Sequence, residues 1–131
     1  AEELAALAAD ARAVNEAAAP EEVRARVRHA MAVAGTATSS AAIDLALEPY
    51  DPARTEGHRM AVPRLQQLLA RLAALPLRER EGVVGLDPAR APTIVAGVAI
   101  LLEVLRAFGL DSVEVSERDI LWGVALEAAS A

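Results

Sequence analysis

An apolar stretch that stops at a glycine and a threonine constrains the fold of this chain more than any other feature. The stretch and its continuation read Met31-Ala32-Val33-Ala34-Gly35-Thr36-Ala37-Thr38-Ser39-Ser40. We expect a buried strand over residues 29–34 and a helix over residues 38–47. A helix that begins here leaves backbone N–H groups without partners, so the turn could bind a phosphate or the edge of a nucleotide. The alternative is a tight turn in which Thr36 or Thr38 is only the N-cap.

The composition favours a helix-rich chain that forms one domain or part of one. Of its 131 residues, 54% are hydrophobic and only 2% aromatic, and alanine, the best helix former, supplies much of the apolar share. Apolar residues at helical spacing predict about six helices. Besides residues 38–47 these helices cover residues 2–14, 62–75, 76–81, 89–108 and 117–128.

Few strands are expected. Apart from residues 29–34, alternation predicts a strand only over residues 112–116, before a helix capped by Ser116. Residues 20–22 read as a helix start, although the alternation over residues 23–27 leaves a strand open there. Residues 48–52 and 82–88 read as turn and loop, and residues 54–60 as a loop or short extended piece. Because two strands cannot form a stable sheet alone, the chain reads as an incomplete unit, and its start without methionine fits a fragment.

Charge and composition exclude several classes of function. The net charge of −6 disfavours a free-standing nucleic-acid-binding protein, and the absence of cysteine excludes a thiol nucleophile or a zinc–thiolate site. No basic leader precedes an apolar segment, and the apolar run over residues 91–102 is too short to span a bilayer. A cytoplasmic protein with no membrane association is expected.

Four further residues are candidates for ligand contact, each with a structural alternative. Arg90 opens the predicted helix over residues 89–108, where a cation opposes the helix dipole, so it needs a partner: a substrate phosphate, or else Asp87 or another carboxylate. Gly97 inside that helix indicates close packing of another backbone, or approach of a ligand. Arg54 and His58 in a polar segment could contact a polyanion, while a surface or hydrogen-bonded role is the alternative for His58.

Four segments, in order, resemble the exopolyphosphatase / guanosine-pentaphosphate phosphohydrolase (Ppx/GppA) family over residues 2–127. The first is the Gly35-Thr36 turn, and the second is the polar loop that contains Arg54 and His58. The third runs from Leu86 through Arg90 to Gly97, and the last is the end of the chain after Val113. The segments are Val33-Ala34-Gly35-Thr36-Ala37-Thr38, Leu47-Glu48-Pro49-Tyr50-Asp51-Pro52-Ala53-Arg54 with Gly57-His58-Arg59, Leu86-Asp87-Pro88-Ala89-Arg90-Ala91 with Ile94-Val95-Ala96-Gly97, and Val113-Glu114-Val115-Ser116-Glu117 with Leu121 and Gly123.

The resemblance implies a helix-rich α/β fold, as part of the second lobe of a ribonuclease H-like, actin-like ATPase superfold, over residues 1–131. It implies Mg²⁺-assisted hydrolysis of a terminal phosphoanhydride of polyphosphate or pppGpp. The family's glycine-rich phosphate loops and catalytic glutamate are not found in this sequence. The chain is therefore expected to be inactive alone, to need the missing N-terminal lobe, and to form a homodimer.

On this interpretation the chain supplies no catalytic residue and no metal ligand. The expected ligand-facing residues are Gly35, Thr36, Thr38, Arg90, Arg54, His58 and Gly97. Pro92 stands where the family has an acidic residue, so any polar role of that acid is lost. Two alternatives stay open: a non-catalytic helical interaction module, and a degenerate protein that senses a nucleotide or phosphate without hydrolysis.

Overall fold

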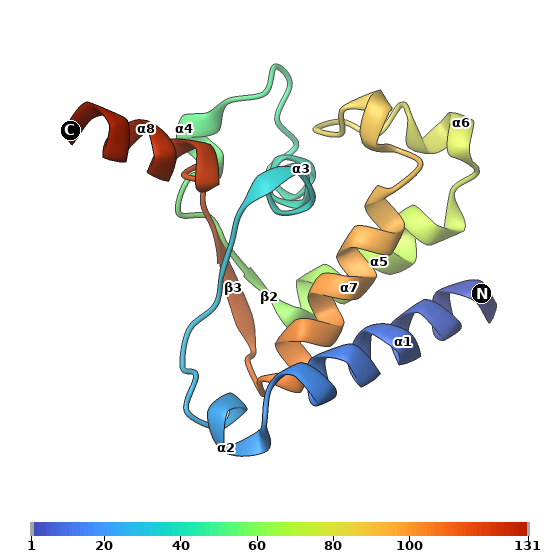
Figure 1. Ribbon diagram of the computed structural model, residues 1–131. Coiled ribbons are helices and arrows are strands. Elements are labelled where there is room, and N and C mark those ends of the chain that lie inside the picture. Colours follow the sequence, from blue (N-terminus) through green and yellow to red (C-terminus); the bar gives the residue numbers. More distant parts are fainter. Residues whose placement is uncertain (1, 131) are drawn as a thin grey trace.

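The helix α7 (Ile94–Ala107) lies at the centre of the fold. In the computed structural model, which describes residues 2–130, α7 runs between α1 (Glu2–Ala18) and α5 (Val62–Ala74), as Figure 1 shows. Its buried side chains recur every three or four positions and include Ile94, Val98, Leu102 and Leu105. This spacing places them on the side that α5 and the sheet cover.

Among residues 2–130 the sheet has three short strands in the order β1-β3-β2. The central strand β3 (Ser112–Val115) pairs in parallel with β1 (Met31–Ala32) and antiparallel with β2 (Arg59–Ala61). On β3, Val113 packs into the main core with Met60, while Val115, on the same face, packs under α3 (Ala34–Asp44). The third strand, β2, lies in the polar segment expected to be a loop or short extended piece.

The remaining elements are short or peripheral. They are α2 (Glu21–Arg24), α4 (Pro52–Thr55), α6 (Leu77–Arg80), the 3₁₀ turn η1 (Pro88–Arg90) and α8 (Ile120–Ser130). The structure confirms the helices predicted over residues 2–14, 62–75 and 76–81, and the loop over residues 82–88. Residues 20–22 do begin a helix, and no strand forms over residues 23–27. Within residues 2–130, no helix is both long enough and apolar enough to cross a membrane.

The boundary between strand and helix near Gly35 differs from the prediction. The expected strand over residues 29–34 has only two residues, and α3 begins at Ala34, so Gly35 lies in the first turn of the helix. Ala34 adopts a left-handed φ of 67°, which turns the chain sharply from β1 into α3. Thr38 is not the N-cap: its hydroxyl donates to the carbonyl of Ala34, one turn back (3.2 Å).

The long helix predicted over residues 89–108 begins at Ile94 instead. Pro92 has no N–H, so the helical hydrogen bond from residue 92 to the carbonyl of Pro88 cannot form. The chain forms η1, with the Asp87 carboxylate capping Ala89 N–H (2.9 Å), and then a turn before α7. Arg90 therefore lies in a separate 3₁₀ turn, away from the dipole of α7. At the other end Gly109, with φ 64°, ends α7 as predicted.

The last helix begins at Ile120, three residues after its predicted start. Its cap is Asp119, whose carboxylate accepts from Leu121 N–H (3.0 Å) and Trp122 N–H (3.3 Å). The predicted cap, Ser116, donates instead to Glu56. Every residue of α8 is exposed, and Figure 1 shows the helix projecting from the body of the protein.

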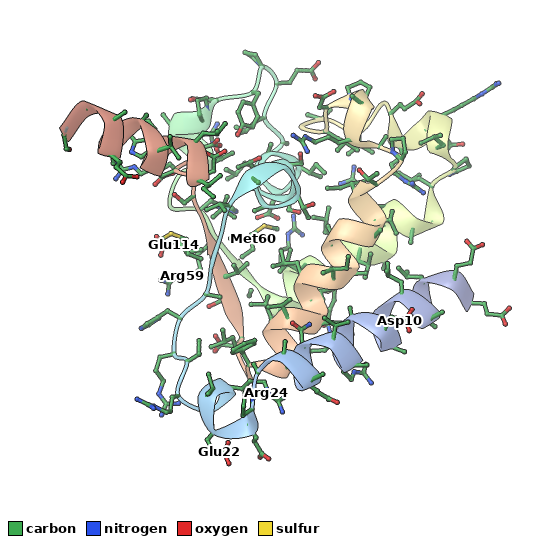
Figure 2. All side chains as sticks on the ribbon, viewed as in Figure 1. Asp10, Glu22, Arg24, Arg59, Met60 and Glu114 are labelled. Carbon is green, nitrogen blue, oxygen red and sulfur yellow. The ribbon has the colours of Figure 1, made fainter. Side chains whose placement is uncertain are left out.

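A buried carboxylate attaches α1 to α7. Glu103 on α7 is 1% exposed and accepts hydrogen bonds from Arg12 on α1 (3.1 Å) and Arg106 (2.5 Å). Burial favours a higher pKa for Glu103, but the two guanidinium groups outweigh it and hold the pKa below its ordinary value. Nearby, Arg24 on α2, labelled in Figure 2, donates to the carbonyl of Ala107 at the end of α7 (3.0 Å). Both contacts fix the N-terminal segment to the central helix.

The substitution Glu103→Gln is expected to lower the free energy of unfolding by about 1 to 3 kcal/mol at pH 7. A carboxyl whose pKa is lowered by folding stabilises the protein above its unfolded-state pKa, and this contribution is lost as the pH falls through the folded-state pKa. The difference between wild type and Glu103→Gln should therefore shrink below about pH 4. Urea unfolding at several pH values measures it, with the exposed Glu79→Gln as the control. A difference that does not change with pH would contradict the assignment.

The helices α3 and α7 approach each other closely where Gly97 faces Thr36. A Cβ atom placed on Gly97 would overlap the hydroxyl of the Thr36 side chain. Glycine costs about 1 kcal/mol inside a helix relative to alanine, so the close packing explains its presence. The sequence indicates close packing of another backbone on Gly97, or approach of a ligand; in the described residues the atoms that pack on Gly97 belong to the side chain of Thr36.

We expect Gly97→Ala to lower the free energy of unfolding by about 1 to 2 kcal/mol, because the overlap with Thr36 outweighs the gain in helix propensity. Gly123→Ala is the matched control, since Gly123 also lies in a helix but a Cβ there meets open space. Chemical unfolding of both variants makes the comparison. Equal stability of the two variants would show that the α3–α7 contact is looser than described.

Candidate functional site

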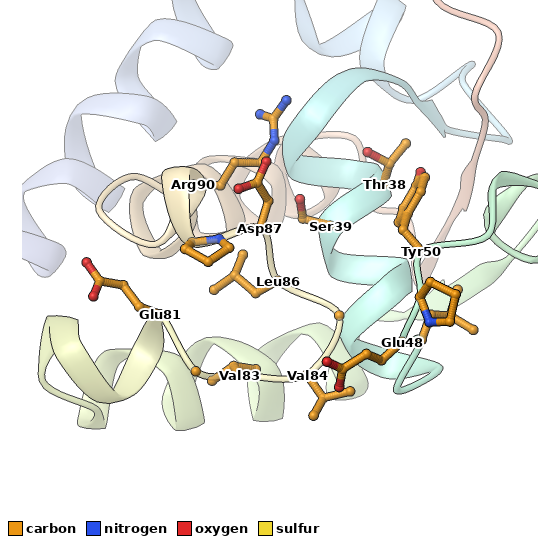
Figure 3. A pocket seen from close by; sticks show the side chains of 15 residues that line it. Thr38, Ser39, Glu48, Tyr50, Glu81, Val83, Val84, Leu86, Asp87 and Arg90 are labelled. Carbon is orange, nitrogen blue, oxygen red and sulfur yellow. The ribbon is translucent and has the colours of Figure 1, made fainter.

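A cavity of about 690 Å³ lies beside α3. It is bounded by the first half of α3, the segment over residues 47–50 and the loop over residues 81–90, and we refer to it as the α3 cavity. Figure 3 shows the side chains around it. They belong to Thr38, Ser39, Leu47, Glu48, Pro49, Tyr50, Glu81, Val83, Val84, Leu86, Asp87, Pro88 and Arg90, with Gly82 and Gly85 contributing backbone.

The guanidinium of Arg90 lies directly against Gly35 in the first turn of α3. A Cβ atom on Gly35 would fall onto the guanidinium itself, so this arrangement requires a residue without a side chain. Asp87 does not pair with Arg90, because its carboxylate caps η1. Among residues 2–130, Arg90 forms no ion pair. The guanidinium of Arg90 thus lies at the first turn of α3, and an arginine and a helix N-terminus both favour anions.

Five of the seven residues predicted to face a ligand gather around the start of α3. Gly35 contacts Arg90, and Thr36 contacts Gly97. Thr38 and Arg90 line the α3 cavity. Thr36 and Gly97 face each other between α3 and α7 and do not line the α3 cavity.

Arg54 and His58 lie apart from this group. Arg54 is exposed on α4, and neither residue lines the α3 cavity. The Nε2 atom of His58 lies 2.8 Å from Asp44, which also accepts from Arg64. Burial favours a higher pKa for Asp44, but Arg64 and His58 together lower it. His58 is therefore a hydrogen-bonded histidine at the C-terminal end of α3, the alternative given for it from sequence.

Tyr50 lines the α3 cavity. The sequence pattern did not single it out as a ligand-facing residue. Its hydroxyl donates to Glu117, close to the hydroxyl of Thr55 (3.4 Å). Burial, and then the hydrogen bond to the carboxylate of Glu117, raise the pKa of Tyr50 above its ordinary value. The only available signal was a tyrosine between two prolines in a segment read as a turn.

The loop opposite Tyr50 rests on the backbone of α3. Gly85 has a φ of 86°, and a Cβ atom there would overlap the carbonyl of Ala42. The loop can therefore reach α3 only with a glycine at this point, and this contact closes one end of the α3 cavity.

No metal site accompanies the cavity within the part of the chain that the structure describes. Over residues 2–130, no three His, Asp or Glu side chains are grouped so that they could hold one ion. The acidic residues around the cavity, Glu48, Glu81 and Asp87, are spread along its rim.

Comparison with known proteins gives the family. Residues 2–130 match the family model described as the Ppx/GppA phosphatase family. The chain belongs to this family. Exopolyphosphatase 2 of Mycobacterium tuberculosis is 32% identical over 101 residues, which are 74% of this chain and 32% of that protein. A bifunctional 3-dehydroquinate synthase/phosphatase of Fusobacterium nucleatum is 35% identical over 95 residues, or 72% of this chain and 14% of that protein.

The fold agrees with the family assignment. The crystal structure of the Aquifex aeolicus Ppx/GppA family member superimposes with a TM-score of 0.80 at 25% identity, covering 92% of this chain and 39% of that one. The predicted helix-rich α/β fold of an actin-like lobe is confirmed. The chain spans about a third of the length of the Mycobacterium tuberculosis protein.

We expect Gly85→Ala to lower the free energy of unfolding by about 2 to 5 kcal/mol, because it combines a left-handed backbone with overlap on Ala42. The control is Gly57→Ala: Gly57 also has a positive φ, 75°, but a Cβ there meets nothing within 4 Å. It should cost only the backbone part, about 1 to 2 kcal/mol. Thermal unfolding separates the two variants, and equal losses would mean that the loop does not press on α3.

Proposed function

We propose that this chain forms a second-lobe part of a phosphohydrolase that cleaves terminal phosphoanhydrides of polyphosphate or pppGpp. In this proposal the α3 cavity faces the phosphate-bearing part of the substrate. The observation that carries the proposal is the Arg90 guanidinium, which lies against Gly35 without a carboxylate partner among residues 2–130. Family membership and the relative called an exopolyphosphatase support the choice of reaction.

The chemistry assigned to this chain is binding and orientation. A guanidinium can donate two parallel hydrogen bonds to one phosphate, and the first-turn N–H groups of α3 add a favourable dipole. Glu48, Glu81 and Asp87 on the rim, together with the net charge of −6, oppose a long polyanion. The positive charge and the catalytic carboxylate that hydrolysis requires are therefore proposed to come from the N-terminal lobe.

Mg²⁺ is part of the proposal for the whole enzyme and not for this chain. Residues 2–130 offer no group of ligands that fits the ion, so we assign its binding to the N-terminal lobe. A homodimer is a further expectation from the family resemblance, and a cytoplasmic location is one from the composition of the sequence.

The exposed helix α8 favours a second candidate function, that of an interaction module. Ile120 and Leu121 are 80% and 72% exposed, and Trp122 and Val124 are more than half exposed. An apolar helix of this kind is typical of a surface that another protein segment covers. In the first proposal the same helix would be covered by another part of the enzyme.

Binding of tripolyphosphate to the chain, measured by titration calorimetry, tests the site. Arg90→Ala is expected to weaken binding about 10- to 100-fold, because a hydrogen bond to a charged group contributes about 1.5 to 3 kcal/mol. Gly35→Ala should also weaken it while keeping the charge, because its Cβ displaces the guanidinium. The control is Arg78→Ala, an exposed arginine of α6 away from the cavity. Equal effects of Arg90→Ala and Arg78→Ala would remove Arg90 from the site.

Turnover separates an enzyme from a sensor. Joined to an N-terminal lobe with the glycine-rich loops, the chain is expected to support Mg²⁺-dependent orthophosphate release from polyphosphate or pppGpp. Binding without release would favour the degenerate sensor, and neither binding nor release would favour the interaction module.

A further inference from the structure

Two hydroxyl groups, one from Tyr50 at the cavity wall and one from the buried Thr55, converge on one carboxylate just after β3. The hydroxyls of Tyr50 and Thr55 both donate to the Oε1 atom of Glu117. Thr55 is fully buried, while Tyr50 is 48% exposed. The Glu117 carboxylate therefore connects Thr55, which is buried, with Tyr50, which lines the α3 cavity.

A second carboxylate, on the segment over residues 55–57, accepts hydrogen bonds from residues at the end of β3. Glu56, next to Thr55, accepts from the Ser116 hydroxyl (3.1 Å) and from the backbone N–H of Glu117 (2.5 Å). The backbone N–H of Gly57 also donates to the carbonyl of Val115 (2.8 Å). The segment over residues 55–57 is therefore held firmly against the end of β3, independently of Tyr50.

The Tyr50 ring has no comparable support from the core. It belongs to neither buried cluster, and about half of its surface is open. In Figure 3 it stands beside Thr38 at the cavity. Its position at the wall therefore depends on where its hydroxyl is held, and the acceptor of that hydroxyl is the Glu117 carboxylate, with the Thr55 and Thr38 hydroxyls beside it.

We propose that Glu117 is a positioning residue that holds Tyr50 as a wall of the α3 cavity, and that losing it weakens binding of a phosphate-bearing ligand there. Glu117 itself does not line the cavity, so it acts through Tyr50. The identity of the ligand rests on the proposed function, whereas the tether itself does not.

The ionisation of Tyr50 tests the tether directly, since it is the single tyrosine of the chain. Absorbance of the phenolate against pH gives its pKa in the native protein. Glu117→Gln keeps the size of the side chain and removes the charge, so it should lower the pKa of Tyr50 toward its ordinary value. Glu114→Gln is the control, because Glu114 lies on β3, three residues before Glu117, but pairs with Arg59 (3.3 Å). Far-UV circular dichroism verifies the fold of each variant at each pH. An unchanged Tyr50 titration in Glu117→Gln would overturn the proposal.

Tripolyphosphate binding tests the consequence. Glu117→Gln and Tyr50→Phe are each expected to weaken binding about 3- to 10-fold, equivalent to about 0.7 to 1.4 kcal/mol. The double variant should bind no more weakly than Tyr50→Phe alone, because both changes act on the same contact: Tyr50→Phe removes the donor, and Glu117→Gln replaces the charged acceptor by a weaker, neutral one. Effects that multiply, or an unaffected Glu117→Gln beside a weakened Arg90→Ala, would overturn the positioning role. Absence of binding in the wild type would overturn the proposed function and this consequence, while the titration would still decide the tether.

Discussion

The close approach of α3 to α7 and η1 determines the rest of this structure. Two glycines allow this approach. The side chain of Thr36 packs against Gly97, and the guanidinium of Arg90 packs against Gly35. Because neither glycine has a Cβ, the first turn of α3 can lie against the segment that leads into the central helix. The strand β3 then fits beneath α3, where Val115 packs on Ala37 and Ala41. The sheet, the cavity and the anion-attracting corner all follow from this contact.

The same contact explains why the candidate site is built from parts distant in sequence. The start of α3 supplies a helix dipole, η1 supplies a guanidinium, and the loop over residues 81–90 closes the cavity through Gly85. The contacts of η1 and of the loop over residues 81–90 with α3 are made at glycines, Gly35 and Gly85, and not through a large apolar side chain. A wall of this kind is sensitive to single added methyl groups, since packed interiors cannot absorb them without strain. Structural and ligand-facing roles are therefore difficult to separate at Gly35.

Periodicity predicted the helices over residues 2–14 and 62–75, because their apolar residues recur at regular spacing over several turns. It failed where a single residue decided the outcome. Pro92 moved the start of α7 to Ile94, and Asp119, not Ser116, caps α8. Of the candidate site, the first turn of α3 and Arg90 were found because glycine and arginine are unusual at such positions. Tyr50 and Glu117 were not, since their contact joins residues 67 positions apart and leaves no local pattern.

The charges around the α3 cavity bear on the function proposed for this chain. Among residues 2–130 the Arg90 guanidinium has no ion-pair partner, and three carboxylates, those of Glu48, Glu81 and Asp87, also lie around the cavity. Asp87 is engaged as a cap, whereas the other two add negative potential near the opening. Under the proposed function, a single phosphate would lie close to Arg90, and the other two carboxylates would repel a longer chain of phosphates. A substrate with many phosphates would then have to extend away from this rim, toward a surface that carries the compensating positive charge.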